Sequence, residues 1–343
     1  MTESKQHPLV TMANLGLLVW VLVRFVPWPE ADILDWIFLS CPLVFVPLGL
    51  AHGGLDLNRP RRVQLAQGIG SLGLALSYYV ETPWSAILAG SWLIASSMFA
   101  LHAVERLALH NRRPLPELCF DVGLLYLAVG ALFALAGSLK TSFLGLSPKT
   151  IKTITAHLHF AGFATPFVAG LIGRCLVERP APPATHSLYR KVVPLVLLTP
   201  ALLVATAMMP PLAKTLAAIT ASAGLLGMAL LILGPVPSRV QGWGARTLVG
   251  ISGASLLSSM AIACVGAYEA HLGFHSLEPS ALGSSVSDPQ MLTPEVLDPA
   301  GARALLLSKL HACTAAWGFV GSALVGFTLK SEPAFKPPDT KLY

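Results

Sequence analysis

Apolar and polar residues alternate along this chain in long blocks. Extended apolar runs are separated by short segments that carry most of the charged residues. A helix needs about 20 apolar residues to cross a bilayer. The pattern therefore predicts an all-α fold, a polytopic transmembrane helical bundle of about ten spans. The predicted spans cover residues 10–27, 33–50, 63–80, 84–102, 117–138, 151–174, 192–209, 213–234, 246–270 and 303–329.

Composition supports this interpretation. The 343 residues are 54% hydrophobic and 12% charged, whereas soluble domains have about 25% charged residues. Because so little polar surface cannot cover a soluble globule, we expect the lipid bilayer to surround the chain. Residues 1–343 are predicted to form a single integral membrane domain. The sequence contains no basic stripe or base-stacking motif, which argues against a nucleic-acid partner.

The positions of Lys and Arg predict orientation. Basic residues follow the even-numbered spans, and positive charge is enriched on the cytoplasmic side. We therefore expect an inner-membrane protein with both termini in the cytoplasm. The loop after the fifth span is an exception, because it places Lys140, Lys149 and Lys152 outside. No small-residue cleavage site follows the N-terminal segment, so the first span is expected to be retained.

The longest connection, residues 271–302, is rich in Ser, Pro and acidic residues. Loops of this length are often functional lids or disordered segments. We expect a partly ordered cap over the outer mouth of the bundle.

Ionisable residues gather in the outer part of the predicted membrane region. His157 and His159 lie in the sixth span and His311 in the tenth, while Glu269, His271 and His275 end the ninth. Ionisable groups inside a membrane indicate a functional site by default. Two residues apart on a helix, His157 and His159 point about 200° away from each other. One of them should therefore face the site while the other bonds a neighbouring helix.

Two chemistries fit these residues. Neutral imidazoles from different helices, namely His157, His311, His271 and His275, are candidate ligands for a divalent metal such as Zn, Cu or Fe. Without a metal, the candidate acids and bases are His157, His159, His311, Glu269 and the buried Asp121. Each imidazole could instead simply bond a carbonyl or a serine of a neighbouring helix. Candidate substrate-binding aromatic residues are Trp317, Phe160, Tyr126 and Phe163.

A second polar group lies at the predicted cytoplasmic side. It contains His52, Asp56, His102, Glu105 and Glu117, for which we expect structural roles at helix ends. The five cysteines stand singly in or beside apolar segments, so packing is the expected role and a disulfide framework is not. Nucleotide-binding, serine-hydrolase and c-type haem motifs do not occur in the sequence.

Two segments resemble a known family. ELCFDVGLLYLAVGALFALAGS and LGLSPKTIKTITAHLHFAGFATPFVAGLIGR are similar to the central block of the YndJ-like bacterial membrane proteins. The matching residues are Asp121, Gly123, Tyr126, His157, His159, Phe160, Ala161, Gly162 and Phe163. LSKLHACTAAWGFVGSALVGF resembles a late family segment through His311, Gly318 and Phe319, with Ala312 and Ala315 in place of the family's Gly and Asn. The resemblance implies a polytopic protein with intramembrane histidines and names no reaction.

The first functional hypothesis is a membrane-embedded enzyme that acts on a lipophilic substrate. Its chemistry would be metal-assisted or a proton transfer, such as the isomerisation or cyclisation of a polyene. The alternatives are a transporter in which the same groups relay protons or bind a cation, and a structural membrane subunit whose histidines only join helices.

Overall fold

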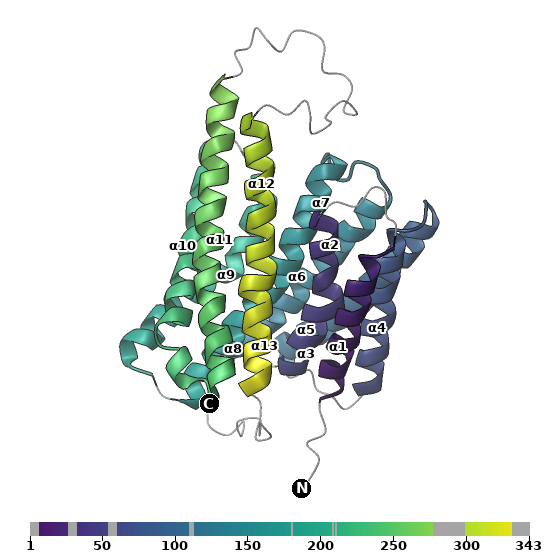
Figure 1. Ribbon diagram of the computed structural model, residues 1–343. Coiled ribbons are helices and arrows are strands. Elements are labelled where there is room, and N and C mark those ends of the chain that lie inside the picture. Colours follow the sequence, from purple (N-terminus) through teal and green to yellow (C-terminus); the bar gives the residue numbers. More distant parts are fainter. Residues whose placement is uncertain are drawn as a thin grey trace.

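The computed structural model describes residues 7–26, 33–53, 60–109, 113–179, 181–207, 209, 211–276 and 299–330. Within these ranges the chain forms ten long helices that run up and down, and it contains no extended strand (Figure 1). Seven of them are uninterrupted: α1 (Pro8–Val23), α4 (Pro60–Ser77), α5 (Trp84–Leu109), α6 (Leu115–Ser138), α9 (Pro183–Thr206), α10 (Pro211–Leu233) and α11 (Trp243–Ser276). A short 3₁₀ turn, η3 (Pro237–Arg239), joins α10 to α11.

The predicted all-α bundle is confirmed, and each predicted span corresponds to one helix. Eight of the ten helices are long and apolar enough to cross a membrane. The first predicted span falls on α1, which has only 16 residues. The third falls on α4, whose 18 residues include Arg61, Arg62, Gln64 and Gln67 and are less apolar. The predicted loop 271–302 is shorter at both ends, because α11 extends to Ser276 and α12 begins at Pro299. Residues 277–298 lie outside the described ranges.

The other three helices each contain a π-helical segment. They are α2 (Ile33–Ser40), η1 (Cys41–Phe45) and α3 (Val46–His52); α7 (Pro148–His157), η2 (Leu158–Ala164) and α8 (Thr165–Glu178); and α12 (Pro299–Cys313), η6 (Thr314–Gly321) and α13 (Ser322–Lys330). In a π-helix each carbonyl bonds five residues ahead, and such segments are rare and often lie at functional sites.

Side-chain donors support all three π segments. In η2, the Thr165 hydroxyl donates to the Phe160 carbonyl at 3.0 Å. In η6, the Ser322 hydroxyl donates in the same way to the Trp317 carbonyl at 3.3 Å. In η1 the donor is the Gln67 amide of α4, which lies 2.8 Å from the Pro42 carbonyl. The carbonyls of Phe160 and Trp317 also accept the backbone N–H of the same Thr165 and Ser322, so each has two donors. The Pro42 carbonyl has Pro47 five residues ahead, which cannot donate, so the Gln67 amide supplies its hydrogen bond, as an apolar surrounding requires.

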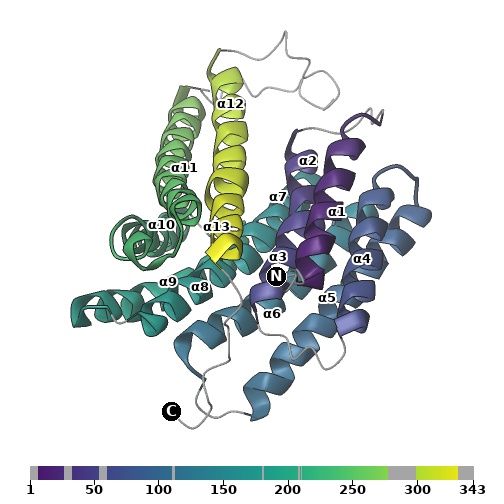
Figure 2. The same cartoon turned by 60° about the horizontal axis from the view of Figure 1, so that its bottom comes forward.

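The three π segments pack against one another at the centre of the bundle. The Phe45 ring of η1 lies 6.0 Å from Phe160 of η2 and 5.0 Å from Trp317 of η6, measured between ring centroids. In the tilted view of Figure 2, the interrupted helices lie between α4 and α5 on one side and α9, α10 and α11 on the other. The irregular backbone therefore forms one connected region.

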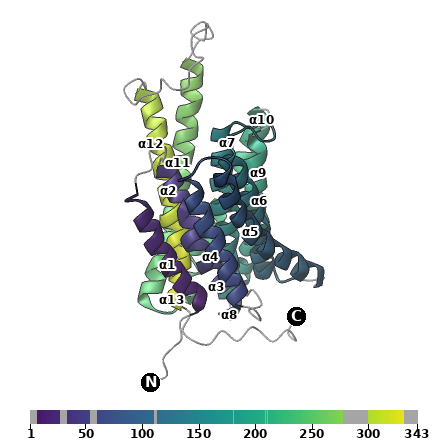
Figure 3. The same cartoon turned by 90° about the vertical axis from the view of Figure 1, so that its right-hand side faces the viewer.

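Charged residues distinguish the two ends of the bundle. The end at which α1 begins and α13 ends is called here the basic end (Figures 1 and 3), because helix termini there carry Arg61, Arg106, Arg174 and Arg246. At the opposite end, the Lys152 ammonium lies 2.6 Å from the Asp35 carboxylate. The ion pair compensates the charge of Lys152, which is one of the three lysines that the charge rule places on the outer side.

Candidate functional site

His157 and His311 come from different interrupted helices and are held in the same way. His157 is the last residue of α7, and its Nδ1 lies 2.8 Å from the Thr153 carbonyl. His311 is close to the end of α12, and its Nδ1 lies 2.9 Å from the Ser259 carbonyl on α11. The Ser259 hydroxyl also contacts His311, because it lies 3.4 Å from the His311 carbonyl.

The contact with Thr153 fixes the tautomer of the His157 ring, because a carbonyl oxygen can only accept and Nδ1 therefore donates to it. Nε2 of His157 then keeps its lone pair in the neutral imidazole. Nδ1 of His311 has two partners within reach, since the Ser259 hydroxyl and the Ser259 carbonyl each lie 2.9 Å away, so it either accepts from the hydroxyl or donates to the carbonyl. The helices that carry the two rings meet at their π segments, η2 and η6. We call these two residues the imidazole pair. A charge on one ring disfavours a charge on the other, so the pair is suited to holding a single proton.

His159 has a different environment, although it is only two residues from His157. Its side chain is fully buried. Nδ1 donates to the Thr155 carbonyl at 2.8 Å, and Nε2 accepts from the Trp92 indole N–H on α5 at 3.0 Å. The ring edge also packs on Phe38, with 4.8 Å between centroids. Both nitrogens are therefore occupied by the bundle itself, so His159 joins helices, as the two-residue spacing predicts for one of the pair.

Aromatic residues connect the imidazole pair to the centre of the bundle. Phe160, three residues after His157, contacts Phe45, and Phe45 contacts Trp317. Trp20 of α1 completes the group, with its ring centroid 4.6 Å from that of Trp317. The Trp317 Nε1 atom is buried and has no acceptor among the described residues. Since buried donors are nearly always paired, this N–H is available for an acceptor on a bound molecule.

The other two aromatic candidates have packing environments. Phe163 is fully buried, and its ring lies 4.3 Å from Phe167 between centroids. The Tyr126 hydroxyl donates to the Leu197 carbonyl on α9 at 3.1 Å, and its side chain lies against Gly162. The contacts of these residues join α6, η2, α8 and α9 and do not include either member of the imidazole pair.

Three of the predicted site residues cannot be placed as side chains. Glu269, His271 and His275 belong to the last turns of α11, but their side chains lie outside the described residues. Among the side chains that the structure does describe, no three or more His, Cys, Asp or Glu residues are grouped as metal ligands. The two free Nε2 atoms of the imidazole pair would supply two ligands of a metal site.

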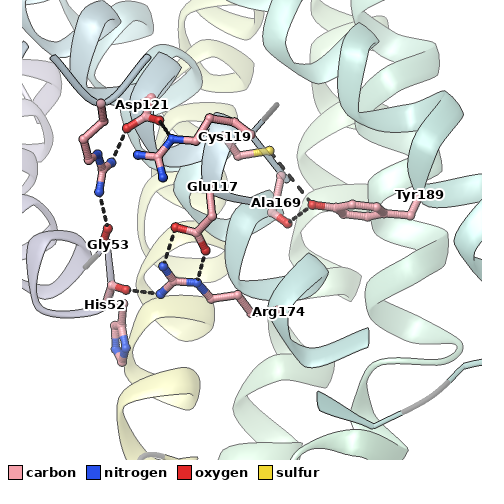
Figure 4. Close-up of polar contacts among 10 residues, drawn as sticks. His52, Gly53, Glu117, Cys119, Asp121, Ala169, Arg174 and Tyr189 are labelled. Carbon is pink, nitrogen blue, oxygen red and sulfur yellow. Dashed lines mark hydrogen bonds and ion pairs between the residues drawn. The ribbon is translucent and has the colours of Figure 1, made fainter. Parts of the chain in front are cut away.

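Asp121 does not belong to the imidazole pair. It lies in a cluster of charged residues at the basic end (Figure 4). Its fully buried carboxylate bonds the Arg106 guanidinium of α5 and lies 3.1 Å from Nε of Arg113. Arg106 also donates to the Gly53 carbonyl at 3.3 Å. The two guanidiniums offset part of the cost of burying this carboxylate. The geometry therefore gives Asp121 the role of an ion-pair partner.

The same cluster contains a second ion pair. The Arg174 guanidinium of α8 forms a two-pronged contact with Glu117 of α6, at 2.7 and 2.8 Å. Arg174 also donates to the His52 carbonyl and lies over the Phe120 ring at 4.3 Å. We call the five residues Arg106, Arg113, Glu117, Asp121 and Arg174 the basic-end cluster. The structural role expected for Glu117 and His52 fits these contacts. His102 and Glu105, for which the same role is expected, lie 3.9 Å apart.

Sequence reasoning missed two features of these sites. The three π segments were not predicted, and the arginines of the basic-end cluster were considered only as markers of orientation. Pro47 and Pro166, which cannot donate a backbone hydrogen bond, follow η1 and η2 closely. An internal Pro within a predicted span is the signal that could have indicated two of the three irregular segments.

Comparison with known proteins gave one match. The model of a family described as YndJ-like protein matches residues 37–279, which is well over half of the chain. The matched region includes η1, η2 and the basic-end cluster, and it ends before α12 begins. A search of curated proteins and a search of solved structures gave no match.

Proposed function

This chain belongs to the YndJ-like family, and we propose that it is a membrane-embedded enzyme that moves a proton on a lipophilic substrate. The imidazole pair would be its general acid and general base. One observation carries the proposal: two histidines from separate helices each have Nδ1 within 2.9 Å of a backbone carbonyl, and Nε2 of each ring has no partner among the described residues. A fixed ring with a free nitrogen is what general acid–base catalysis requires.

The pair suits proton transfer because its two members are not equivalent at any moment. Mutual repulsion disfavours two protonated rings, so when one ring carries a proton it can act as the acid while the neutral ring acts as the base. A proton removed by one ring and returned by the other leaves the composition of the substrate unchanged. Isomerisation and cyclisation have this stoichiometry, so substrate and product would have equal mass.

The surroundings suggest the chemistry of the substrate. Phe160 lies one helical turn after His157 and contacts Phe45, and the two rings offer apolar contact area. The buried Trp317 N–H would donate to an oxygen atom of the substrate. We therefore propose an apolar molecule with one hydroxyl or carbonyl group, which reaches the site from the bilayer. The proposed location is a bacterial inner membrane, with the basic end in the cytoplasm.

The same geometry admits a metal-assisted form of the reaction. His157 and His311 would be two ligands, and His271 and His275 are the remaining candidates. Such a metal would polarise the substrate oxygen. Elemental analysis of the purified protein tests this form. Zn, Cu or Fe that is retained by the wild type and lost in both His157→Gln and His311→Gln would support it.

A proton-coupled transporter is the second candidate, and the three adjoining π segments favour it. Interrupted helices that meet near the middle of a membrane protein frequently form transport sites. Here the imidazole pair would carry the coupled proton. A structural membrane subunit, in which all the histidines only join helices, is the third candidate.

The decisive experiment compares membranes from cells that express the wild type, His157→Gln, His311→Gln or His186→Gln. His186 is the control, because it lies at the start of α9 and belongs to neither the imidazole pair nor the basic-end cluster. Lipid extracts are compared by chromatography and mass spectrometry, without preselecting compounds. The proposal predicts two compounds of equal mass in these extracts. Their ratio should be shifted in cells that express the wild type or His186→Gln. Both site variants should lose at least about 100-fold of this conversion.

Proton flux into vesicles containing the same four proteins separates the candidates. Flux that depends on His157 and His311, without any compound of altered ratio, would replace the enzyme with a transporter. If the folded variants equal the wild type in both lipid conversion and proton flux, the enzyme and the transporter are both contradicted. That result would favour the structural subunit.

A further inference from the structure

A groove lies on the side of the bundle between α1 and α4. It has a volume of about 400 Å³ and is lined by Met12 of α1 and by Arg61, Gln64, Leu65, Ile69 and Leu72 of α4. Gly68 forms part of its floor. Leu65 and Ile69 are more than half exposed. The groove belongs to neither the imidazole pair nor the basic-end cluster.

The groove has a polar end and an apolar length. Arg61 and Gln64 lie in the first two turns of α4, at the basic end, while Leu65, Ile69 and Leu72 follow along the helix. Arg61 to Leu72 spans eleven residues, which is about 16 Å at 1.5 Å per residue. Half of a hydrocarbon core of about 30 Å is about 15 Å. The groove thus matches one leaflet in length.

Charge complementarity indicates the headgroup. The Arg61 side chain is exposed and forms no ion pair within the described part of the chain. A guanidinium at the membrane surface binds a phosphate with two parallel hydrogen bonds. Leu65, Ile69 and Leu72 then offer an apolar track for an acyl chain. We propose that this groove is a binding site for one anionic phospholipid of the leaflet at the basic end, with its phosphate on Arg61.

The sequence offers a variant that closes the groove. A Cβ atom added to Gly68 would meet only the end of the Met12 side chain, at 3.0 Å. Met12 is flexible, so Gly68→Leu is accommodated and fills the space. Gly90 on α5 provides the matched control, because an added Cβ there has nothing within 4 Å. Arg246, an exposed arginine at the start of α11 and at the same end, is the control for Arg61.

The test uses the full chain in nanodiscs containing equal amounts of phosphatidylglycerol and phosphatidylcholine. Native mass spectrometry then measures the lipid retained by each variant. We expect the wild type, Arg246→Gln and Gly90→Leu to retain one phosphatidylglycerol preferentially. Arg61→Gln should lose about fivefold of this preference. Gly68→Leu should lose the retained lipid of either headgroup.

Two results would overturn the proposal. The first is a lipid count and preference in Arg61→Gln and Gly68→Leu that equal those of their controls. The second is a dimer that retains no lipid and dissociates in Gly68→Leu, which would assign the groove to a second copy of the chain. Thermal unfolding of each variant in detergent verifies that it is folded.

Discussion

The polar groups at the two levels of this bundle are bonded in different ways. In the basic-end cluster, each carboxylate is bound by at least one guanidinium, and further donors reach the carbonyls of His52 and Gly53. In the imidazole pair, Nδ1 of each ring lies next to a backbone carbonyl, and Nε2 has no partner in the part of the chain that the structure describes.

This difference separates a structural role from a chemical one. Charged groups that form ion pairs within the protein hold helices together, although Nη2 of Arg113 has no hydrogen-bond partner among the described residues. Removing one partner of such a pair leaves a buried charge without compensation. Groups with unused capacity contribute less to the fold and can bind or react. Substitutions in the two regions should therefore affect different observables. The predictions below run from the largest expected loss of stability to the smallest.

Asp121→Asn should have the largest effect on stability. It leaves Arg106 and Arg113 without their carboxylate in a buried position, which costs about 3–5 kcal/mol. The measurement is thermal unfolding in detergent, together with the yield of folded protein. The double variant Asp121→Leu/Arg106→Met, which removes a charge of each sign, should recover much of the loss. An unchanged unfolding temperature in Asp121→Asn would remove the structural assignment of the cluster.

His159→Phe should destabilise the protein by about 1–3 kcal/mol, because it leaves the buried Trp92 N–H without an acceptor. The double variant His159→Phe/Trp92→Phe removes donor and acceptor together and should be more stable than His159→Phe alone. Thermal unfolding of the two single variants and the double variant measures the coupling. Additive effects of the two single substitutions would show that this hydrogen bond does not join α5 to η2.

Arg174→Lys should cost about 1–2 kcal/mol, since lysine keeps the charge but loses the two-pronged contact with Glu117. Arg246→Lys is the control, because Arg246 is exposed, and it should leave the unfolding temperature unchanged. Equal effects of the two substitutions would contradict the geometry described for Arg174.

His157→Gln and His311→Gln should each change the free energy of unfolding by less than about 1 kcal/mol. Their effect should appear in the lipid conversion or proton flux described above. His186→Gln should change neither. Site variants that lose stability to the same extent as His159→Phe would place the imidazole pair among the helix-joining groups.

Trp317→Phe should not lower stability, and it removes a buried donor that has no acceptor among the described residues. Trp36→Phe is the matched control, because the Trp36 N–H lies 3.3 Å from the Trp20 carbonyl and its loss should be measurable. Thermal unfolding of the ligand-free protein in detergent compares the two. A larger loss in Trp317→Phe would mean that its N–H already has a partner.

The sequence predicts the helices well because their apolar runs are long and set by membrane thickness. The spacing of His157 and His159 also predicts that one ring faces away from the other. The π segments escape prediction, because an apolar run has the same pattern whether its backbone bonds four or five residues ahead. The partners of Asp121 escape it for another reason, since Arg106 belongs to a different helix and only tertiary packing brings the two together.

Cross-linking of the imidazole pair tests the central claim most directly. His157→Cys/His311→Cys is made in a background where Cys264 and Cys313 are replaced by Ser, and membranes are treated with a short bifunctional thiol reagent. We predict efficient cross-linking of this pair and little cross-linking of His159→Cys/His311→Cys, because His159 is buried against Trp92. Failure of the first pair to cross-link, or equal cross-linking of both pairs, would contradict the account.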